Sequence, residues 1–430
     1  MIPLLVKTTA EPSRFDLFSP PILLGVVYFA LYVVGALDVV LEQIFPTLAI
    51  YRLRWKFYGF QGLSVMALLH LLTSYILFVL GYALPIGKGI AGLIPRRSSH
   101  VSAGWASVTT VIMFTGTFIV LVLYTLTEGY GRFKGTGQSG LENLSLLGEM
   151  SLVFYSLSLY RFMLARKSSD SPMSKWDIFF LWGIMVPLQI AISLSIGSRM
   201  RTLNLIFMAL VAYHYAYKRF TFRFVFALAC VIIIIMPTMG LLRESPERRP
   251  ELTLSYPWET VMGRTSSLEG FTVTFENLDM APEPEPFISV ITTGLIPRFV
   301  WPNKPQSTFP YRFSFWVTGN PLAWVSPSMQ GEFILLFGHW GGLLAMFGLG
   351  IFWRGLYELF AGSETNSRSC GFIYPLLLPA LLTVEAGFIG PYSVLFRFLA
   401  VGTGVFWLVR SVPKVRRRYF QEYREVTLSR

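Results

Sequence analysis

The run MQGEFILLFGHWGGLLAMFGLGI at 329–351 decides how this chain folds. It is apolar except for Gln330, Glu332 and His339. Because about 20 predominantly apolar residues in a helix cross a bilayer core, the run predicts a membrane-spanning helix. It could equally be a re-entrant segment followed by a helix, because three glycines interrupt it: Gly338, Gly341 and Gly342.

The same apolar character extends over most of the 430 residues. Hydrophobic residues make up 53% of the chain, charged residues only 14%, and the mean hydropathy is +0.54. This composition excludes a soluble protein and predicts an all-α polytopic membrane protein. We expect about ten transmembrane helices, within a range of 9–12. They are expected near 20–41, 58–84, 105–127, 144–165, 176–197, 202–217, 221–242, 329–351, 371–388 and 391–410.

The pattern divides the chain into an N-terminal transmembrane bundle at 1–242, a large loop at 243–327, and C-terminal helices with a basic tail at 328–430. The tail carries Arg416, Arg417 and Arg418 and is expected to be cytoplasmic, since the inner side retains basic residues. Counting back places both termini inside and the long loop on the outer face. One basic connection, YRLRWK at 51–56, does not fit this count.

The long loop is expected to contain short helices. The first part of 258–278 predicts an amphipathic helix lying at the outer membrane interface. The acidic segment APEPEP at 281–286 predicts a stiff, extended spacer. The segment TTGLIPRFVWPNKP at 292–305 then combines prolines with Arg298, Lys304 and two aromatic residues.

Metal and nucleic-acid sites are not indicated. The four histidines and two cysteines are scattered, without a metal-ligand spacing, so neither a metal nor another cofactor is expected. The net charge of +12 suits attraction of the basic tail to anionic lipids. Nucleic-acid binding would need a soluble basic domain, which this pattern lacks.

Cations on the predicted outer face are the main candidates for binding a substrate. Planar guanidinium groups bind phosphate oxygens bidentately, so several of them suit a lipid carrying a diphosphate. Arg298 and Arg264 are the candidates for catalysis. The candidates for holding the diphosphate are Arg199, Arg201, Arg243, Lys304 and Arg312. Arg199 and Arg201 could instead extend from a helix end toward the membrane surface.

Two further candidates lie in the run that opened this section. Glu332 is an ionisable residue at the start of an apolar segment, and such residues are expensive and by default functional. It could be a catalytic base or the partner of a loop arginine. His339 could also be the base, although among glycines it could simply accompany close helix packing.

Four segments, in this order, carry a resemblance to a known family: GSR at 197–199, Arg243 after the next apolar run, LIPRFVWPNKP at 295–305, and GEFILLFGHWGG at 331–342. The arrangement resembles the O-antigen polymerase (Wzy) and oligosaccharide repeat-unit polymerase family over about 195–360. The segments at 295–305 and 331–342 are the more specific ones.

The resemblance implies a multi-pass glycosyltransferase of the bacterial inner membrane whose active site faces the periplasm. Such an enzyme joins undecaprenyl-diphosphate-linked oligosaccharide units with inversion at the anomeric carbon and without a metal. Arginine or lysine would then neutralise the departing diphosphate. The implied partners are the lipid-linked oligosaccharide, the bilayer and a chain-length regulator protein.

Other functions remain open. The related O-antigen ligases carry an outer-loop histidine, to which His339 is a loose counterpart. A lipid-linked oligosaccharide flippase would need pseudo-symmetric halves, whereas one asymmetric loop dominates here. A membrane acyltransferase would need a histidine near the middle of the chain, and His214 is the candidate.

Overall fold

The computed structural model describes residues 16–37, 40, 62–94, 103–128, 141–167, 173–195, 199–220, 266–286, 288, 292, 296, 301, 309–321, 325–362 and 371–411. Helices account for 84% of these residues, and no strand occurs among them. The predicted all-α class is therefore confirmed.

The N-terminal helices follow the predicted apolar runs. In order they are α2 (Pro20–Tyr28) with the π-helical turn η1 (Phe29–Val33), α4 (Val65–Ala83), α5 (Ile86–Leu93), α6 (Ala103–Glu128), α8 (Leu141–Lys167), the continuous α9 (Lys175–Phe179), η3 (Phe180–Met185) and α10 (Val186–Ser195), and α11 (Arg199–Ala216). The span expected at 221–242 lies outside the described residues.

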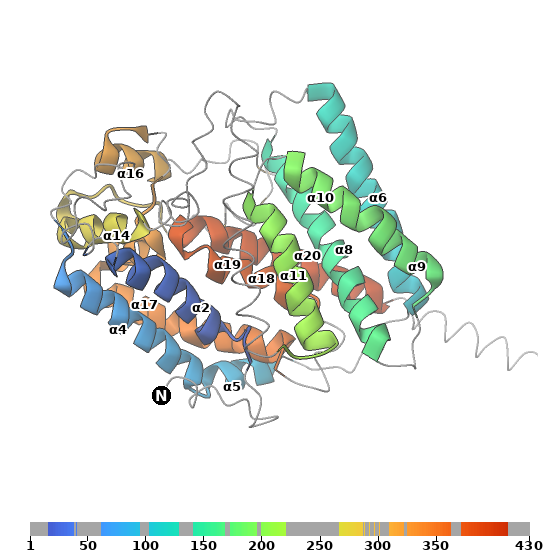
Figure 1. Cartoon of the computed structure of the whole chain (residues 1–430), viewed down its shortest axis with the longest axis horizontal. Coiled ribbons are helices and arrows are strands. Elements are labelled where there is room, and N and C mark those ends of the chain that lie inside the picture. Colours follow the sequence, from blue (N-terminus) through green and yellow to red (C-terminus); the bar gives the residue numbers. More distant parts are fainter. Residues whose placement is uncertain are drawn as a thin grey trace, which may run out of the picture.

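The C-terminal part is less regular. Its elements are α14 (Ser266–Glu276), η5 (Leu278–Met280), α16 (Phe309–Thr318), α17 (Ser328–Phe360), α18 (Tyr374–Leu377), α19 (Pro379–Leu382), η7 (Val384–Ala386) and α20 (Ile389–Ser411). In Figure 1, α18, α19 and α20 lie between a group formed by α2, α4, α5 and α17 and a second group formed by α6, α8, α10 and α11.

Four helices within the described residues are long and apolar enough to cross a membrane: Pro20–Leu37, Val65–Ala83, Ser328–Phe360 and Ile389–Val409. Shorter apolar helices occur at Ala106–Ile119 and Asn204–Ala216. The described part of the chain is therefore helical, with four candidate membrane-spanning helices.

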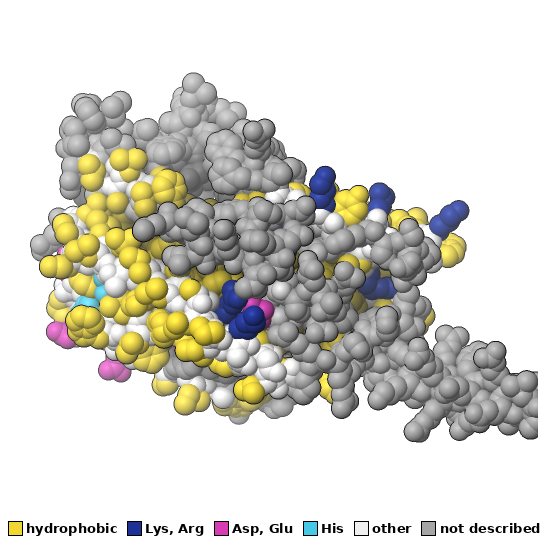
Figure 2. All heavy atoms as spheres, turned by 90° about the horizontal axis from the view of Figure 1, so that it is seen from below, with side chains coloured by type: hydrophobic (Ala, Val, Ile, Leu, Met, Phe, Trp, Pro, Cys, Tyr) yellow, Lys and Arg dark blue, Asp and Glu magenta, His cyan; other side chains and the backbone are white. Residues whose placement is uncertain are grey.

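One face of α4 is apolar and exposed, through side chains spaced three or four residues apart: Leu69, Leu72, Ile76 and Leu80. Figure 2 shows hydrophobic side chains over much of this side of the molecule. In water such a surface would be unfavourable, so it suits contact with lipid.

Helices α4 and α17 form the most extensive contact between two elements. A Cβ atom on Gly350 would overlap the backbone oxygen of Phe78, and one on Gly81 would overlap that of Phe347. Glycine therefore lets the two backbones touch, as in membrane helix pairs. His70 lies beside His339, and Phe78, further along α4, lies beside Gly350, further along α17, so the two helices run parallel. This agrees with the expected topology, in which the spans at 58–84 and 329–351 cross the membrane in the same direction.

The run at 329–351 is not one straight helix. Gly338 has φ 73° and ψ 176°, which breaks the helix there. A Cβ on Gly342 would lie 3.2 Å from Cγ1 of Ile334, so the segment before Gly338 folds back against the segment after it. The run is therefore broken and folded back at Gly338, which favours the alternative of a re-entrant segment followed by a helix. We call 328–337 the re-entrant segment.

The span predicted at 371–388 is wrong as a regular helix. The region consists of the two four-residue helices α18 and α19 and the short η7. Pro375 and Pro379 lack the backbone N–H that a continuous helix requires, and Gly387 with φ 88° ends the region. Helix α20 then begins at Ile389, two residues before the expected start of the span at 391–410.

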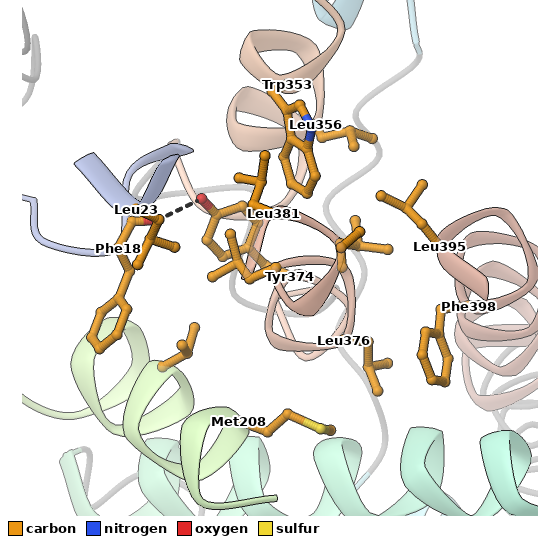
Figure 3. Packing of buried hydrophobic residues seen from close by; sticks show 14 of the residues in the cluster. Phe18, Leu23, Met208, Trp353, Leu356, Tyr374, Leu376, Leu381, Leu395 and Phe398 are labelled. Carbon is orange, nitrogen blue, oxygen red and sulfur yellow. Dashed lines mark hydrogen bonds between the residues drawn. The ribbon is translucent and has the colours of Figure 1, made fainter. Parts of the chain in front are cut away.

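One end of the bundle, here named the Asp16 end, is held by a buried polar cluster. The Asp16 carboxylate accepts hydrogen bonds from the Tyr357 hydroxyl at 2.6 Å and from the Tyr215 hydroxyl at 2.8 Å. Figure 3 shows the adjoining bond from the Tyr374 hydroxyl to the Phe18 carbonyl oxygen, 3.0 Å long. The expected topology places the start of 20–41, the ends of 202–217 and 329–351, and the start of 371–388 on the cytoplasmic side. The contacts of the Asp16 cluster join these same ends and agree with that expectation.

His214 completes this cluster. Its Nδ1 accepts the backbone N–H of Phe220 at 3.0 Å, so the ring hydrogen lies on Nε2, which is 3.4 Å from Asp16 Oδ1. The ring is only 1% exposed. A substrate cannot reach it, so an acyltransferase based on His214 has no support in this arrangement.

The opposite end of the α4–α17 pair, here named the His339 end, carries α14 and α16. An amphipathic helix at the outer membrane interface was expected in the first part of 258–278, of which 258–265 lie outside the described residues. Residues 267–274 are all buried, and α14 packs on α17 and α4. Val273 also joins a small core with Phe309, Phe313, Val317 and Val325. This part of the 243–327 loop is thus integral to the bundle.

The acidic spacer has no regular secondary structure at 282–286. It packs against the beginning of α16, where the Glu285 carboxylate accepts the backbone N–H of Phe309 at 3.0 Å. A carboxylate at a helix N-terminus is favourable because it meets unpaired N–H groups and the positive end of the dipole.

Candidate functional site

The break at Gly338 determines where His339 lies. The imidazole is half-buried and packs edge-on against Phe275 of α14, with ring centroids 4.6 Å apart. Its Nε2 is 3.1 Å from the Phe275 carbonyl oxygen. Since a carbonyl oxygen only accepts, Nε2 carries the hydrogen and Nδ1 holds the lone pair of the neutral ring. The Phe275 carbonyl therefore fixes the tautomer of the neutral His339 ring.

His70 of α4 was missed by sequence reasoning. Its ring lies 6.1 Å from that of His339 and 5.3 Å from that of Phe275. In the sequence His70 is one histidine inside an apolar run, far from the other candidates. A signal was present, because ionisable residues inside membrane helices are by default functional.

Glu332 accepts backbone hydrogen bonds that were not predicted. Its Oε2 accepts the backbone N–H of Phe388 and of Ile389 at 2.6 and 2.9 Å. The residue is only 4% exposed. Glu332 thus caps α20 from another segment and is joined there to backbone groups, a different partner from the arginine considered above.

Next to Glu332, the re-entrant segment holds a second buried polar group. Gln330 accepts the Tyr32 hydroxyl at 2.7 Å and the Ser328 hydroxyl at 3.3 Å, and its amide contacts the Tyr28 hydroxyl. Ser328 has φ 70°, an unusual conformation for a residue other than glycine. Two segments that adjoin helix interruptions, 328–337 and 383–389, therefore meet at a polar centre inside the bundle.

The predicted cations are placed in part. Arg312 is exposed on α16, and its guanidinium donates to the Glu283 carbonyl oxygen at 2.9 Å. Arg199 and Arg201 belong to the first turn of α11. Arg243, Arg264, Arg298 and Lys304 lie outside the described residues. The structure therefore leaves the convergence of these cations as a prediction.

Among the residues described, no three histidine, cysteine, aspartate or glutamate side chains lie together as a metal site would need. The described candidates fall into two places. His339 and His70 are half-buried at the His339 end, whereas Glu332 is enclosed in the polar centre. Accessibility makes the histidine pair the better candidate for contact with a substrate.

In comparisons with protein-family models, with curated proteins and with solved structures, nothing matches this chain.

Proposed function

We propose that this protein is a membrane glycosyltransferase that polymerises undecaprenyl-diphosphate-linked oligosaccharide repeat units at the periplasmic face of the bacterial inner membrane. It would work without a metal and with inversion, and a chain-length regulator protein would be a partner. The observation that carries the proposal is the orientation of His339 within the GEFILLFGHWGG segment. Its Nε2 donates to the Phe275 carbonyl oxygen, so Nδ1 holds the lone pair of the neutral ring.

The placement of α14 and α16 supports this proposal. Both come from the 243–327 loop that carries the candidate arginines, and α14 contacts the histidine pair directly. The described helices of this loop, α14 and α16, therefore lie at the same end of the bundle as the candidate base. A reaction that needs cations for a diphosphate and a base for a hydroxyl could use both together.

In this reaction the hydroxyl of an acceptor sugar attacks the anomeric carbon of the donor unit. The bond from that carbon to the diphosphate oxygen breaks, and the electron pair leaves with undecaprenyl diphosphate. His339 Nδ1 takes the hydroxyl proton. Arg298 and Arg264 would neutralise the negative charge that develops on the diphosphate.

The test uses the purified full chain in detergent, supplied only with lipid-diphosphate-linked repeat units. We expect a ladder of longer products that persists in EDTA. His339→Ala should slow extension by about two to four orders of magnitude. The proposal fails if the wild-type chain forms no covalent product, or if EDTA abolishes the ladder.

A ligase is the first alternative, and it would form product only when a lipid A-core type acceptor is added. A lipid-linked oligosaccharide flippase is the second. The observation that favours it is the pair of broken segments meeting at Gln330 and Glu332, since transporters build their sites from discontinuous helices. A flippase would move a fluorescently labelled lipid-linked oligosaccharide across a vesicle membrane without lengthening the oligosaccharide.

A further inference from the structure

Beside His339 lies a second histidine that the proposed reaction does not yet use. The rings of His70 and His339 are 6.1 Å apart between centroids and nearly perpendicular, at 82°. Both pack against Phe275, and both are half-buried. Each ring therefore contacts protein on one side and has an accessible edge on the other.

The pairing depends on a rigid part of the fold. His70 comes from α4 and His339 from α17, and the contact of Phe78 with Gly350 holds these helices backbone to backbone. An imidazole on the apolar α4 is costly unless a polar group accompanies it. The two helices thus bring two imidazoles to one place at a fixed separation.

A proton taken up by His339 needs an exit. Nε2 already carries a hydrogen and donates it to the Phe275 carbonyl oxygen, so Nδ1 is the atom that takes a proton. The resulting imidazolium must lose this proton before the next cycle. Of its two described ring contacts, Phe275 cannot accept a proton and His70 can.

The other titratable groups near the histidine pair lie on α4, α14 and α17. Glu276 of α14 follows Phe275 and is exposed, whereas Glu269 is buried. Glu332 is bound to the beginning of α20. The remaining ones on α4 and α17 are Tyr75, Tyr82, Arg354, Tyr357 and Glu358. Among these groups, the His70 imidazole is the one whose ring contacts that of His339.

We propose that His70 receives the proton that His339 takes from the acceptor hydroxyl and returns it to water. The inference rests on the proposed function. The hydroxyl proton moves to His339 Nδ1, then to His70, directly or through one water molecule, and then to solvent. Neither histidine gains a proton over the cycle. Because His70 acts through His339, it is a positioning residue.

The test compares His70→Gln with wild type in the ladder assay. We expect kcat to fall about ten- to a hundredfold while KM changes less than about twofold, because the role proposed for His70 is to accept a proton from His339 and not to bind the substrate. The fall should be steepest toward acidic pH, where His339 stays protonated for longer. Added imidazole should restore part of the rate of His70→Ala. Phe271→Leu is the matched control, since it removes a ring that packs on His70 without removing a titratable group.

A second measurement does not depend on turnover. In protein labelled with 15N-histidine, the four histidines can be assigned by single substitutions, and His70→Gln should slow the exchange of the His339 ring hydrogens with water. An unchanged exchange rate, or a pH profile and kcat equal to wild type, would overturn the role of His70. This outcome differs from failure of the proposed function, in which the wild-type chain itself makes no ladder.

Discussion

The carboxylate of Glu332 lies 2.9 Å from the backbone nitrogen of Ile389, and this contact ties the re-entrant segment to the first turn of α20. The bond joins two places where a helix is interrupted. Since a helix N-terminus leaves N–H groups without partners, an internal carboxylate allows α20 to begin inside the bundle. Gly387 makes room for it, because a Cβ there would overlap Glu332 Oε1.

Glu332→Gln should therefore act mainly on stability. The amide oxygen can still accept a hydrogen bond, but the charge that faces the helix dipole is lost, at a cost of about 1–2 kcal/mol. Thermal unfolding in detergent measures this. Activity per folded molecule should change less than about tenfold.

Gly387→Ala should destabilise further, because it adds both a clash and an unfavourable positive φ. The matched control is Gly390→Ala, where a Cβ meets nothing within 4 Å. A hundredfold or larger loss of activity in stable Glu332→Gln protein would instead identify Glu332 as a base.

Gly350→Ala should separate α4 from α17. The added methyl group would overlap the Phe78 backbone oxygen, and since backbone cannot move aside locally, we expect a loss of about 1–3 kcal/mol or more. Gly348→Ala is the control on the same helix, with nothing within 4 Å of its added methyl. The two variants are compared by melting temperature in detergent, and equal melting temperatures would contradict the packing described for Gly350.

Asp16→Asn should weaken the Asp16 end in a pH-dependent manner. Burial alone would raise the pKa of Asp16, but His214 and the hydroxyls of Tyr357 and Tyr215 outweigh it and hold the pKa below its ordinary value. A carboxyl with a lowered folded pKa stabilises the protein above its unfolded pKa, about 3.9, and loses this contribution as the pH falls through the folded value.

At neutral pH we expect Asp16→Asn to cost about 1–3 kcal/mol, since buried partners lose a charged acceptor. The gap in melting temperature between wild type and variant should narrow as the pH is lowered below about 4. Asp279→Asn, at an exposed residue, is the control. A gap that stays constant over this range would show that Asp16 is not ionised in the folded protein.

Membrane sidedness can be tested with single cysteines in a chain in which Cys230 and Cys370 are replaced by serine. A cysteine at Pro284 should react with an impermeant reagent added outside, because the spacer belongs to the outer loop. Cysteines at Leu93, which is 82% exposed, and at Arg417 should react only after permeabilisation. The reverse pattern would place the histidine pair and the loop on the cytoplasmic side and remove the basis of the proposed function.

Arg298→Ala and Arg264→Ala should abolish long polysaccharide while the protein stays inserted and abundant. Losing one group that stabilises transition-state charge costs on the order of 3 kcal/mol, or about a hundredfold in rate. Arg298→Lys should restore little, because ammonium lacks the planar fork that holds two phosphate oxygens. The readout is product length on gels with protein abundance by immunoblot. Full activity of Arg298→Lys would indicate that only a positive charge is needed at this position.

Hydropathy was sufficient to predict the helical class and the positions of most described helices, because a long apolar run has few other stable forms in lipid. For 329–351 hydropathy predicted a span, and the glycines at 338, 341 and 342 left a break as the second alternative, which the structure has at Gly338. Hydropathy failed at 371–388, where the run is as apolar as a span. There Pro375 and Pro379 interrupt the backbone bonding, and surrounding protein covers the broken segment.

The candidate site was predicted less well. Sequence position brought His339 to attention, but not His70, because their closeness arises from parallel packing of α4 against α17. Likewise, the sequence around Glu332 is the same whether the side chain acts as a catalytic base or caps the N-terminus of α20. The difference depends on the N–H groups of Phe388 and Ile389, which no local pattern places beside it.

The bond between Asp16 and Tyr357 has a consequence for biogenesis. The two residues are 341 positions apart, and ribosomes add about 5–20 residues per second, so Asp16 is synthesised roughly 17–68 s before Tyr357. During this time the carboxylate lacks that partner, and Tyr215 and His214, which are synthesised earlier than Tyr357, are the partners available to it. The bundle can therefore close at this end only after α17 has been inserted, which makes the Asp16 cluster a late checkpoint in the assembly of the nascent chain.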